Sequence, residues 1–171
     1  VKDGQFTSEI MHQLGKVSDV QVSPDHSKIL YGVTYTSIEQ NKGNRELYLM
    51  NVDGSDNVKL TNTPKSESNA RWMNNSQIIY MRSGKLYTAT LEGSALKNET
   101  EVAGAEGMES FELSPAGDKL MFIKSIKAAQ KPTDIYPDLD KSSGRTYDDL
   151  MYRHWDHFVE EVPHTYVANF D

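Results

Sequence analysis

The residues whose types could support chemistry lie near the C-terminal end of the sequence. Three histidines, His154, His157 and His164, are close to Asp156. Imidazole and carboxylate groups are common zinc ligands, but His154 and His157 are three residues apart and no established ligand motif surrounds them. We therefore interpret these histidines as packed or hydrogen-bonded, and we expect neither a metal nor a cofactor.

Nucleophilic catalysis has no support in this sequence. Cysteine is absent, which excludes a thiolate nucleophile and a cysteine-type zinc site. No Gly-x-Ser-x-Gly motif occurs, and no serine has the strand–turn–helix context that such a nucleophile requires. We expect no catalytic residue in this chain.

The remaining candidates are one cation, Arg153, and two adjacent carboxylates, Glu160 and Glu161. The common role of such an acidic pair is a solvated helix end. Arg153 could pair with Asp149, four residues earlier on a helix surface, and Trp155 could be a core aromatic. Their alternative role in binding depends on a family resemblance that is described below.

These candidates lie in a stretch that we expect to fold as an amphipathic helix. Thr146 suits the N-cap and Asp149 the third position of the first turn. Apolar and aromatic side chains recur at helical spacing, at Tyr147, Leu150, Met151, His154, Trp155 and Phe158. The preceding residues 131–138 contain two prolines and are expected to be extended and rich in turns. We define residues 127–161 as an insertion.

The sequence from 17 to 64 sets the pattern for the rest of the chain. It contains four short apolar runs, which predict a four-stranded antiparallel sheet with one buried face on each strand. These runs lie at residues 19–22, 29–35, 46–52 and 58–61. The pattern recurs over 70–94, and again at 111–122 and 164–171. Repeats of roughly 40 to 50 residues with about four strands each are typical of β-propeller blades.

The predicted fold is therefore all-β: a partial β-propeller of about two and a half four-stranded antiparallel blades, with a helical insertion in the third blade. The predicted division is an N-terminal helix or arm, two complete blades and an incomplete third, at residues 1–16, 17–64, 65–104 and 105–171. Because the last repeat stops inside a hairpin, we expect this sequence to be a piece of a longer protein. Tyr48, Tyr87 and Tyr166 recur at equivalent positions and, like Trp72, are interpreted as packing residues.

The N-terminal residues have the signals of a short helix. Thr7 suits the N-cap, Glu9 the first turn and Gly15 the C-cap. Ile10, Met11 and Leu14 share one face at helical spacing, and this face is expected to pack on the first sheet.

Composition excludes several classes of partner. The chain has 171 residues, 25 acidic and 18 basic, and a formal charge of −7. An acidic chain without a Lys/Arg cluster is a poor partner for nucleic acid or an anionic membrane surface. No apolar run approaches the roughly 18 residues of a membrane span.

Two sets of residues carry a family resemblance. The turns at Ser23-Pro24-Asp25 and Ser114-Pro115-Ala116-Gly117 resemble the TolB-like propeller repeat. The insertion is more specific: residues 134–139 and 147–156 resemble the dipeptidyl-peptidase five and acylaminoacyl-peptidase branch of the prolyl oligopeptidase family. That resemblance implies an N-terminal propeller over a C-terminal α/β-hydrolase domain, which carries the Ser-Asp-His triad and is not in this chain.

The resemblance implies a function as well. The parent protein would be a serine peptidase that removes dipeptides or acylated residues, and the propeller would gate and orient short peptides. Glu160 and Glu161 would bind the α-ammonium group of the substrate, and Arg153 is assigned to the same site. Arg153 and Trp155 could also contact the hydrolase domain. We expect a periplasmic or secreted bacterial protein, and a homo-oligomer is possible. The alternative is a TolB-like, non-enzymatic propeller that binds a protein partner.

Overall fold

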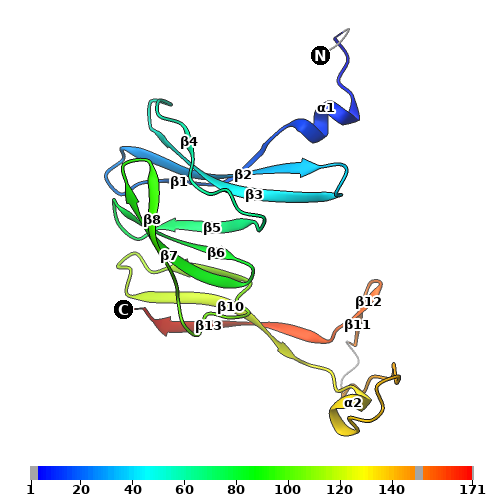
Figure 1. The fold of residues 1–171 in the computed structure, drawn as a ribbon. Coiled ribbons are helices and arrows are strands. Elements are labelled where there is room, and N and C mark those ends of the chain that lie inside the picture. The colour runs from blue at the N-terminus through cyan, green and yellow to red at the C-terminus, as the bar shows by residue number, and fades with distance from the viewer. Residues whose placement is uncertain (1–3, 149–151, 171) are drawn as a thin grey trace. The chain divides into compact units, whose positions relative to one another are not determined.

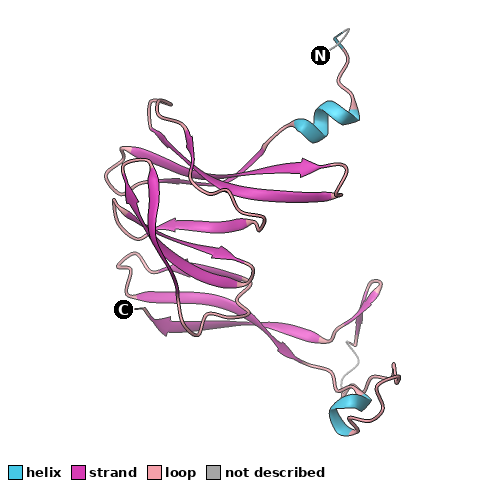
Figure 2. Ribbon diagram, viewed as in Figure 1, coloured by secondary structure: helices cyan, strands magenta, loops and turns pink. Residues whose placement is uncertain are grey.

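The computed structural model describes residues 4–148 and 152–170 and is almost entirely β-structure (Figures 1 and 2). The chain divides into two compact units. One consists of the residues up to 106 together with 115–117, and the other of residues 107–114 and those from 118 onward. Neither helix among the described residues has the length and apolar character of a membrane span.

The first unit contains two four-stranded antiparallel sheets in which sequence order equals spatial order. The first sheet consists of β1 (Lys16–Val22), β2 (Lys28–Ser37), β3 (Lys42–Asn51) and β4 (Val58–Lys59). The second consists of β5 (Glu67–Trp72), β6 (Gln77–Arg82), β7 (Lys85–Glu92) and β8 (Ala95–Glu101). Both sheets are consistent with propeller blades.

The core of this unit lies between the two sheets. Strand β5 contacts β1, β2 and β3 of the first sheet. Alternation along the strands directs one set of apolar side chains into this interface. The buried cluster consists of Leu30, Leu47, Leu49, Ala70, Ile78, Tyr80, Ala89 and Leu91. Trp72 packs against it, as the sequence predicts, and its Nε1–H donates to Gln21 O at 3.3 Å.

The first strand of each sheet carries a bulge at an equivalent position. The pairing register shifts after Ser18 in β1 and after Ser68 in β5. Asp19 and Asn69, each just past the shift, have positive φ angles of 52° and 54°. Asp and Asn tolerate this left-handed conformation better than other non-glycine residues. Asp19 Oδ2 also accepts the Asn69 N–H at 3.3 Å, so one bulge bonds to the other.

The second unit contains a three-stranded antiparallel sheet in the order β13-β10-β9. Strand β9 spans Ser110–Leu113, β10 spans Lys119–Lys127 and β13 spans Glu161–Asn169. Strands β10 and β13 pair from Lys119↔Asn169 to Lys127↔Glu161, whereas β9 pairs only with Leu120 to Ile123 of β10. The outer part of this ribbon leads into residues 128–160, which we call the arm (Figure 1).

One stacked aromatic pair occurs in each of the three sheets. Tyr48 stacks on Tyr31, Tyr87 on Tyr80 and Tyr166 on Phe122, with ring centroids 5.6, 6.0 and 5.3 Å apart. In every case the two residues are direct cross-strand partners. The predicted packing role of the three repeated tyrosines is confirmed.

The Ser-Pro turns are closed by carboxylates. Asp25 Oδ1 accepts from Ser23 Oγ, Ser27 Oγ and the Ser27 N–H at 2.6, 2.8 and 3.0 Å. These hydrogen bonds, that from Ser23 first, lower the pKa of Asp25 to about 2. In the third sheet Ser114 Oγ donates to Asp118 at 2.7 Å, so a carboxylate two positions further along closes the equivalent turn.

The N-terminal helix forms, but it packs less closely than expected. Helix α1 (Ser8–Gln13) has Thr7 as its N-cap, as predicted, and Leu14 rather than Gly15 as its C-cap. It contacts β2, yet Met11 and Leu14 are 46% and 54% exposed. Gly15 lies instead against β2, where a Cβ would come within 2.7 Å of Val33 Cγ1.

The predicted helix in the insertion is wrong. Residues 153–158 form a hairpin of β11 (Arg153–His154) and β12 (His157–Phe158) with a two-residue turn. Trp155 in that turn has a φ of 54°, which a right-handed helix cannot contain. The aromatic and histidine residues here have only moderate helix propensity, and they pack across strands instead.

Other parts of the predicted insertion also differ. Thr146 pairs with Gln130 in an isolated bridge and caps no helix among the described residues. Asp149, Leu150 and Met151, which were assigned to the predicted helix, lie outside the described residues. The segment 131–138, expected to be extended, contains the short helix α2 (Pro132–Ile135). Its first turn is stabilised by the Lys131 N–H, which donates to Asp134 Oδ2 at 2.7 Å.

Candidate substrate-binding site

Arg153 and Glu160 belong to the arm, and Glu161 is the first residue of β13 directly after it. Backbone hydrogen bonds hold the two ends of the arm together. The Ala128 N–H donates to Glu160 O at 2.8 Å, which continues the β10–β13 ribbon by one step. Further out, Gln130 and Thr146 exchange two backbone hydrogen bonds. The arm is therefore a continuation of the sheet, with the candidate side chains near its base.

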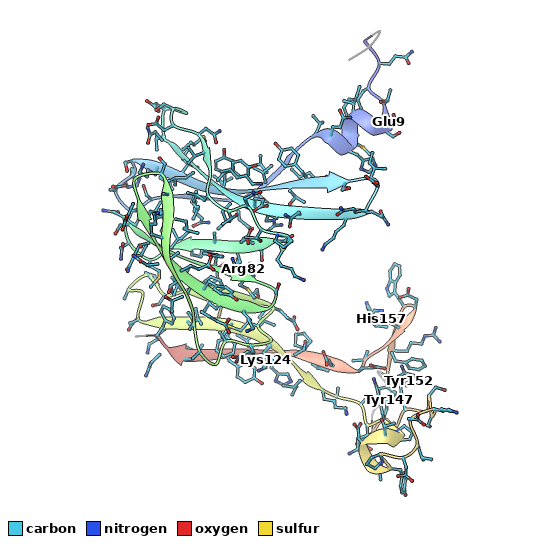
Figure 3. The ribbon with its side chains drawn as sticks, viewed as in Figure 1. Glu9, Arg82, Lys124, Tyr147, Tyr152 and His157 are labelled. Carbon is cyan, nitrogen blue, oxygen red and sulfur yellow. The ribbon has the colours of Figure 1, made fainter. Side chains whose placement is uncertain are left out.

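An aromatic cluster supports the hairpin of the arm. The Tyr147 ring lies 5.7 Å from the ring of Tyr152 and 6.4 Å from that of Phe158 (Figure 3). Tyr147 and Phe158, which the sequence places on one helical stripe, thus do lie together, but through a hairpin. The Val159 N–H donates to Tyr152 O at 2.9 Å and closes this end of the hairpin.

Two arginines lie over the ring of Phe158. The guanidinium carbon of Arg145 is 4.6 Å from the ring centroid, and that of Arg153 is 5.5 Å from it. Both distances are within the range of cation–π attraction. Arg153 is a predicted site residue, and its contact with the Phe158 ring holds it beside the candidate site.

Glu160 accepts hydrogen bonds from two cations of the arm. Its Oε1 is 2.6 Å from Arg145 Nε, and its Oε2 is 2.9 Å from Lys131 Nζ. These contacts, that with Lys131 first, lower the pKa of the Glu160 carboxyl group. Glu160 is thus a carboxylate whose charge is already compensated within the chain.

Glu161 has a different position from its neighbour. It is the first residue of β13, is exposed, and lies opposite Lys127 of β10 in the register. The two glutamates nevertheless border one open hollow, together with Arg145, Asp156, His157, Phe158 and Val159. Glu160 and Glu161 therefore border the same surface, which also contains a cation and an aromatic ring.

The histidines do not form a metal site in the described residues. His154 and His157 are cross-strand partners with ring centroids 5.7 Å apart, and His157 Nδ1 lies 3.2 Å from Asp156 Oδ1. His164 belongs to β13, where it lies near the Tyr166 ring. Within residues 4–148 and 152–170, no group of three or more His, Asp or Glu side chains could hold a metal ion.

Sequence reasoning missed Lys131 and Arg145, the two partners of Glu160. They are 29 and 15 residues away from it in the chain, and no local spacing rule connects such distances. A helix-based interpretation also directed attention to Asp149 as the partner of Arg153. If the two ends of the insertion had been predicted to pair as antiparallel strands, Lys131 would have been expected near Glu160.

Comparison with known proteins gives relatives that match nearly the whole chain. No family model matches it. Dipeptidyl-peptidase 5 of Porphyromonas gingivalis is 36% identical over 167 residues, which is 96% of this chain and 24% of that protein. Dipeptidyl-peptidase 5 of Porphyromonas endodontalis is 31% identical over 173 residues, which is 98% of this chain and 25% of that protein. The chain thus spans about a quarter of the length of each relative.

Solved structures agree with this assignment at the level of the fold. Acylaminoacyl peptidase of Pyrococcus horikoshii superposes with a TM-score of 0.67 at 15% identity, over 92% of this chain and 24% of that protein. A second acylaminoacyl peptidase structure, with a chloromethyl ketone bound, also gives a TM-score of 0.67. This chain is therefore homologous to a segment of dipeptidyl-peptidase 5 that makes up about a quarter of that protein, and it shares the fold of the matching quarter of acylaminoacyl peptidase.

Proposed function

We propose that this chain is the N-terminal propeller part of a serine exopeptidase that releases dipeptides or acylated residues from short peptides. The observation that carries the proposal is the match to two dipeptidyl-peptidase 5 proteins over 96% and 98% of the chain. The nucleophile would belong to a C-terminal α/β-hydrolase domain of the same protein. The present residues would gate and orient the peptide.

The repeated details of the sheets support a propeller. Both four-stranded sheets have the same strand order and a left-handed bulge in the first strand, and a stacked cross-strand aromatic pair occurs in these two sheets and in the three-stranded sheet. Sheets that repeat to this degree are typical of blades arranged around an axis. A ring of blades over an active site would admit short peptides and exclude folded proteins.

The hollow of the arm supports a role in holding the peptide amino terminus. An α-ammonium group is bound by carboxylates through charge-assisted hydrogen bonds. Glu160 already has two cationic partners, so Glu161 is the carboxylate with more capacity for a new one. Arg153 would contribute through Phe158, whose ring it contacts. A periplasmic or secreted location remains part of the proposal.

The test of the enzymatic role compares the full-length protein with the 171-residue chain. Both are assayed with a chromogenic dipeptide substrate and with an acylated amino-acid substrate. We expect turnover by the full-length protein and none by the 171-residue chain. Turnover by the shorter chain would mean that the active site lies within it. No turnover by the full-length protein on either substrate would favour the non-enzymatic, protein-binding propeller.

The test of the carboxylates uses Glu161→Gln and Glu160→Gln in the full-length protein. We expect Glu161→Gln to raise KM for a dipeptide substrate about tenfold, because about 1.4 kcal/mol of charge attraction is lost. Glu160→Gln should have the smaller effect. The matched control is the same peptide with its amino group blocked, for which KM should not change. Equal loss on both substrates would mean that Glu161 acts on structure and does not bind the ammonium group.

A further inference from the structure

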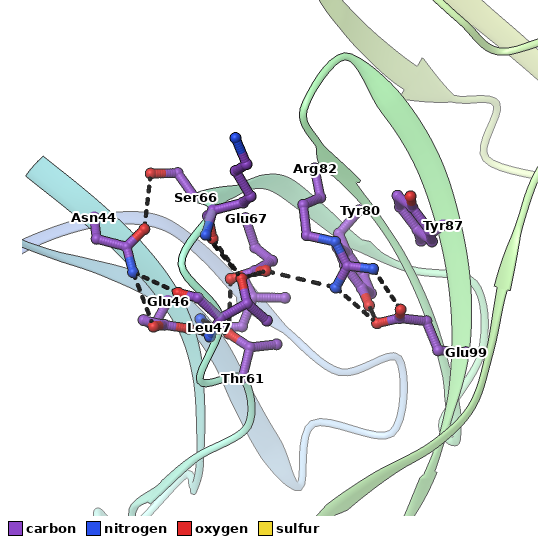
Figure 4. A network of polar contacts seen from close by, with 12 residues as sticks. Asn44, Glu46, Leu47, Thr61, Ser66, Glu67, Tyr80, Arg82, Tyr87 and Glu99 are labelled. Carbon is purple, nitrogen blue, oxygen red and sulfur yellow. Dashed lines mark hydrogen bonds and ion pairs between the residues drawn. The ribbon is translucent and has the colours of Figure 1, made fainter.

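Two buried carboxylates face the same threonine hydroxyl where the first and second sheets meet. Glu46 of β3 is 4% exposed, and Glu67, the first residue of β5, is fully buried. Thr61 Oγ1 lies 2.9 Å from Glu46 Oε2 and 3.0 Å from Glu67 Oε2 (Figure 4). The same oxygen accepts the Leu47 N–H at 2.9 Å. Since a hydroxyl has a single proton, Thr61 can donate to only one of the two carboxylates.

The other carboxylate oxygen of Glu67 faces a second threonine hydroxyl, Thr63, whose single proton also has two acceptors within reach. Thr63 Oγ1 lies 2.8 Å from Glu67 Oε1 and 2.7 Å from Lys65 O, and it accepts the Lys65 N–H at 3.1 Å. Around Glu67, two hydroxyl protons therefore face four acceptor oxygens if both carboxylates are ionised. One further proton, placed on a carboxyl group, would satisfy a third contact.

The surroundings identify which carboxyl group holds that proton. Glu46 has donors of its own: Lys59 Nζ at 3.3 Å, Asn44 Nδ2 at 3.0 Å and the Thr63 N–H at 3.3 Å. Glu46 therefore has hydrogen-bond donors that do not depend on the Thr61 hydroxyl. The cation that faces Glu67 is Arg82 of β6, at 3.7 Å.

The charge of Arg82 is directed mainly at another residue. Its Nη1 lies 3.1 Å from Glu99 Oε2 of β8, and its Nη2 forms an ion pair with the other oxygen of Glu99 (Figure 4). The charged residues of β1 are Lys16 and Asp19, and Asp19 pairs with Arg45 of β3 at 2.6 Å. Burial, and then the nearby Glu46 charge, raise the pKa of Glu67, while Thr63, Thr61 and Arg82 oppose this effect. Burial is the largest of these influences.

We propose that Glu67 keeps its proton in the folded chain at neutral pH and donates it to a threonine hydroxyl, and that loss of this proton at alkaline pH weakens the junction between the first two sheets. The ionised group would be a second buried charge beside Glu46, and the two threonine hydroxyl protons would again face four acceptor oxygens. The device is a pH-sensitive contact between neighbouring sheets. It is independent of any catalytic role of the parent protein.

The direction of the pH effect follows from proton binding. In the unfolded chain Glu67 ionises near the ordinary glutamate pKa of about 4.3, while in the folded chain it retains its proton to higher pH. Between these two values the folded state binds more protons, so the folding constant falls as pH rises, by up to roughly tenfold per pH unit. Above the folded pKa of Glu67 the loss is complete.

The experiment compares three forms of the 171-residue chain: wild type, Glu67→Gln and Glu46→Gln. Folding constants are measured by urea denaturation from pH 5 to pH 9. A glutamine at position 67 has the shape of a protonated glutamate, donates hydrogen bonds and cannot ionise. We expect Glu67→Gln to remove the loss of stability that the wild type shows as pH rises from 5 toward the folded pKa of Glu67. Glu46→Gln, the matched control, should destabilise the chain at neutral pH because it removes the charge that pairs with Lys59.

Two outcomes would overturn the proposal. The first is a Glu67→Gln variant whose free energy of unfolding falls with rising pH as steeply as that of the wild type. The second needs no variant: infrared spectra of the wild type in D₂O should contain the carbonyl stretch of a protonated carboxyl group at neutral pH. Absence of that band would show that Glu67 is ionised, and this measurement decides the question even where the Gln variant fails to fold.

Discussion

Glu67 and Glu160 lie in different units of the chain, and their surroundings move their pKa values in opposite directions. Glu67 is fully buried between two sheets, where loss of hydration raises its pKa. Glu160 lies on the arm, where Lys131 and Arg145 lower its pKa. The comparison shows that burial decides the protonation of a carboxyl group where cations are already engaged elsewhere, and that cations decide it near solvent.

The same contrast separates the two regions as structures. The junction of the first two sheets is held by a continuous apolar cluster, whereas the arm is held by ion pairs and by aromatic ring contacts. Ion pairs near solvent contribute little to stability, since water competes with both partners. We therefore expect substitutions to have large effects at the junction and small effects on the arm.

The largest difference should come from two matched leucines. Leu47 of β3 is fully buried, and Leu139 of the arm is 47% exposed. Leu47→Ala should lower the free energy of unfolding by about 2–5 kcal/mol, through lost apolar contact and the cavity that remains. Leu139→Ala should change it by less than about 1 kcal/mol. Urea denaturation of both variants measures this, and similar losses would contradict the contrast between the regions.

A smaller effect is expected from the hydroxyl between the two buried carboxylates. Thr61→Val keeps the β-branched shape but removes the proton that Glu46 and Glu67 share. We expect a loss of about 1–3 kcal/mol in the free energy of unfolding, the usual result when a buried polar group loses its partner. Thr100→Val on the exposed strand β8 is the control and should be nearly neutral. Equal effects at both positions would mean that the buried hydroxyl is not needed.

The third prediction concerns pH on the acidic side. Because the folded pKa of Glu160 is lowered, the ion pairs it forms stabilise the arm above the ordinary glutamate pKa and are lost as pH falls through the folded value. Arg145→Gln should move the Glu160 titration back up and leave that of Glu67 unchanged. Carboxyl carbon NMR shifts recorded against pH follow both residues. A parallel change at Glu67 would show that the two sites are coupled.

The smallest effect is expected at the tip of the hairpin. Trp155 is 86% exposed, so Trp155→Ser should change the stability of the 171-residue chain by less than about 0.5 kcal/mol. Thermal unfolding followed by circular dichroism measures this. In the full-length protein the same variant tests whether Trp155 contacts the hydrolase domain, because only then would it be destabilising.

Much of the fold could be predicted because the strands and turns of each repeat follow from residues that are close together in the sequence. Alternation at period two located the strands, and the recurrence of Tyr48, Tyr87 and Tyr166 predicted packing residues, which the three stacked pairs confirm. The prediction of a helix in the insertion was wrong because the spacing of its aromatic residues fits one face of a helix as well as it fits a hairpin. Periodicity depends only on the spacing of residues along the chain. It does not show that a turn at Trp155-Asp156 allows aromatic rings on two paired strands to pack together.

The carboxylate network was out of reach for a different reason. Glu46 and Glu67 are joined through Thr61, which lies 15 and 6 residues away from them in the chain. Their burial results from the packing of one sheet on the next, whereas single-residue expectation assigns glutamate to the surface. For the same reason Glu160 and Glu161 could be selected from sequence, but the cations that neutralise Glu160 could not.

Trp72 gives the junction its own optical reporter. The chain has two tryptophans, and they sit in contrasting environments: Trp72 packs on the core and donates to Gln21 of the neighbouring sheet, while Trp155 projects into solvent. In a Trp155→Phe background, the remaining emission would come from the contact between the first two sheets alone. A red shift of that emission at alkaline pH, before global unfolding, would report that the junction between the first two sheets opens.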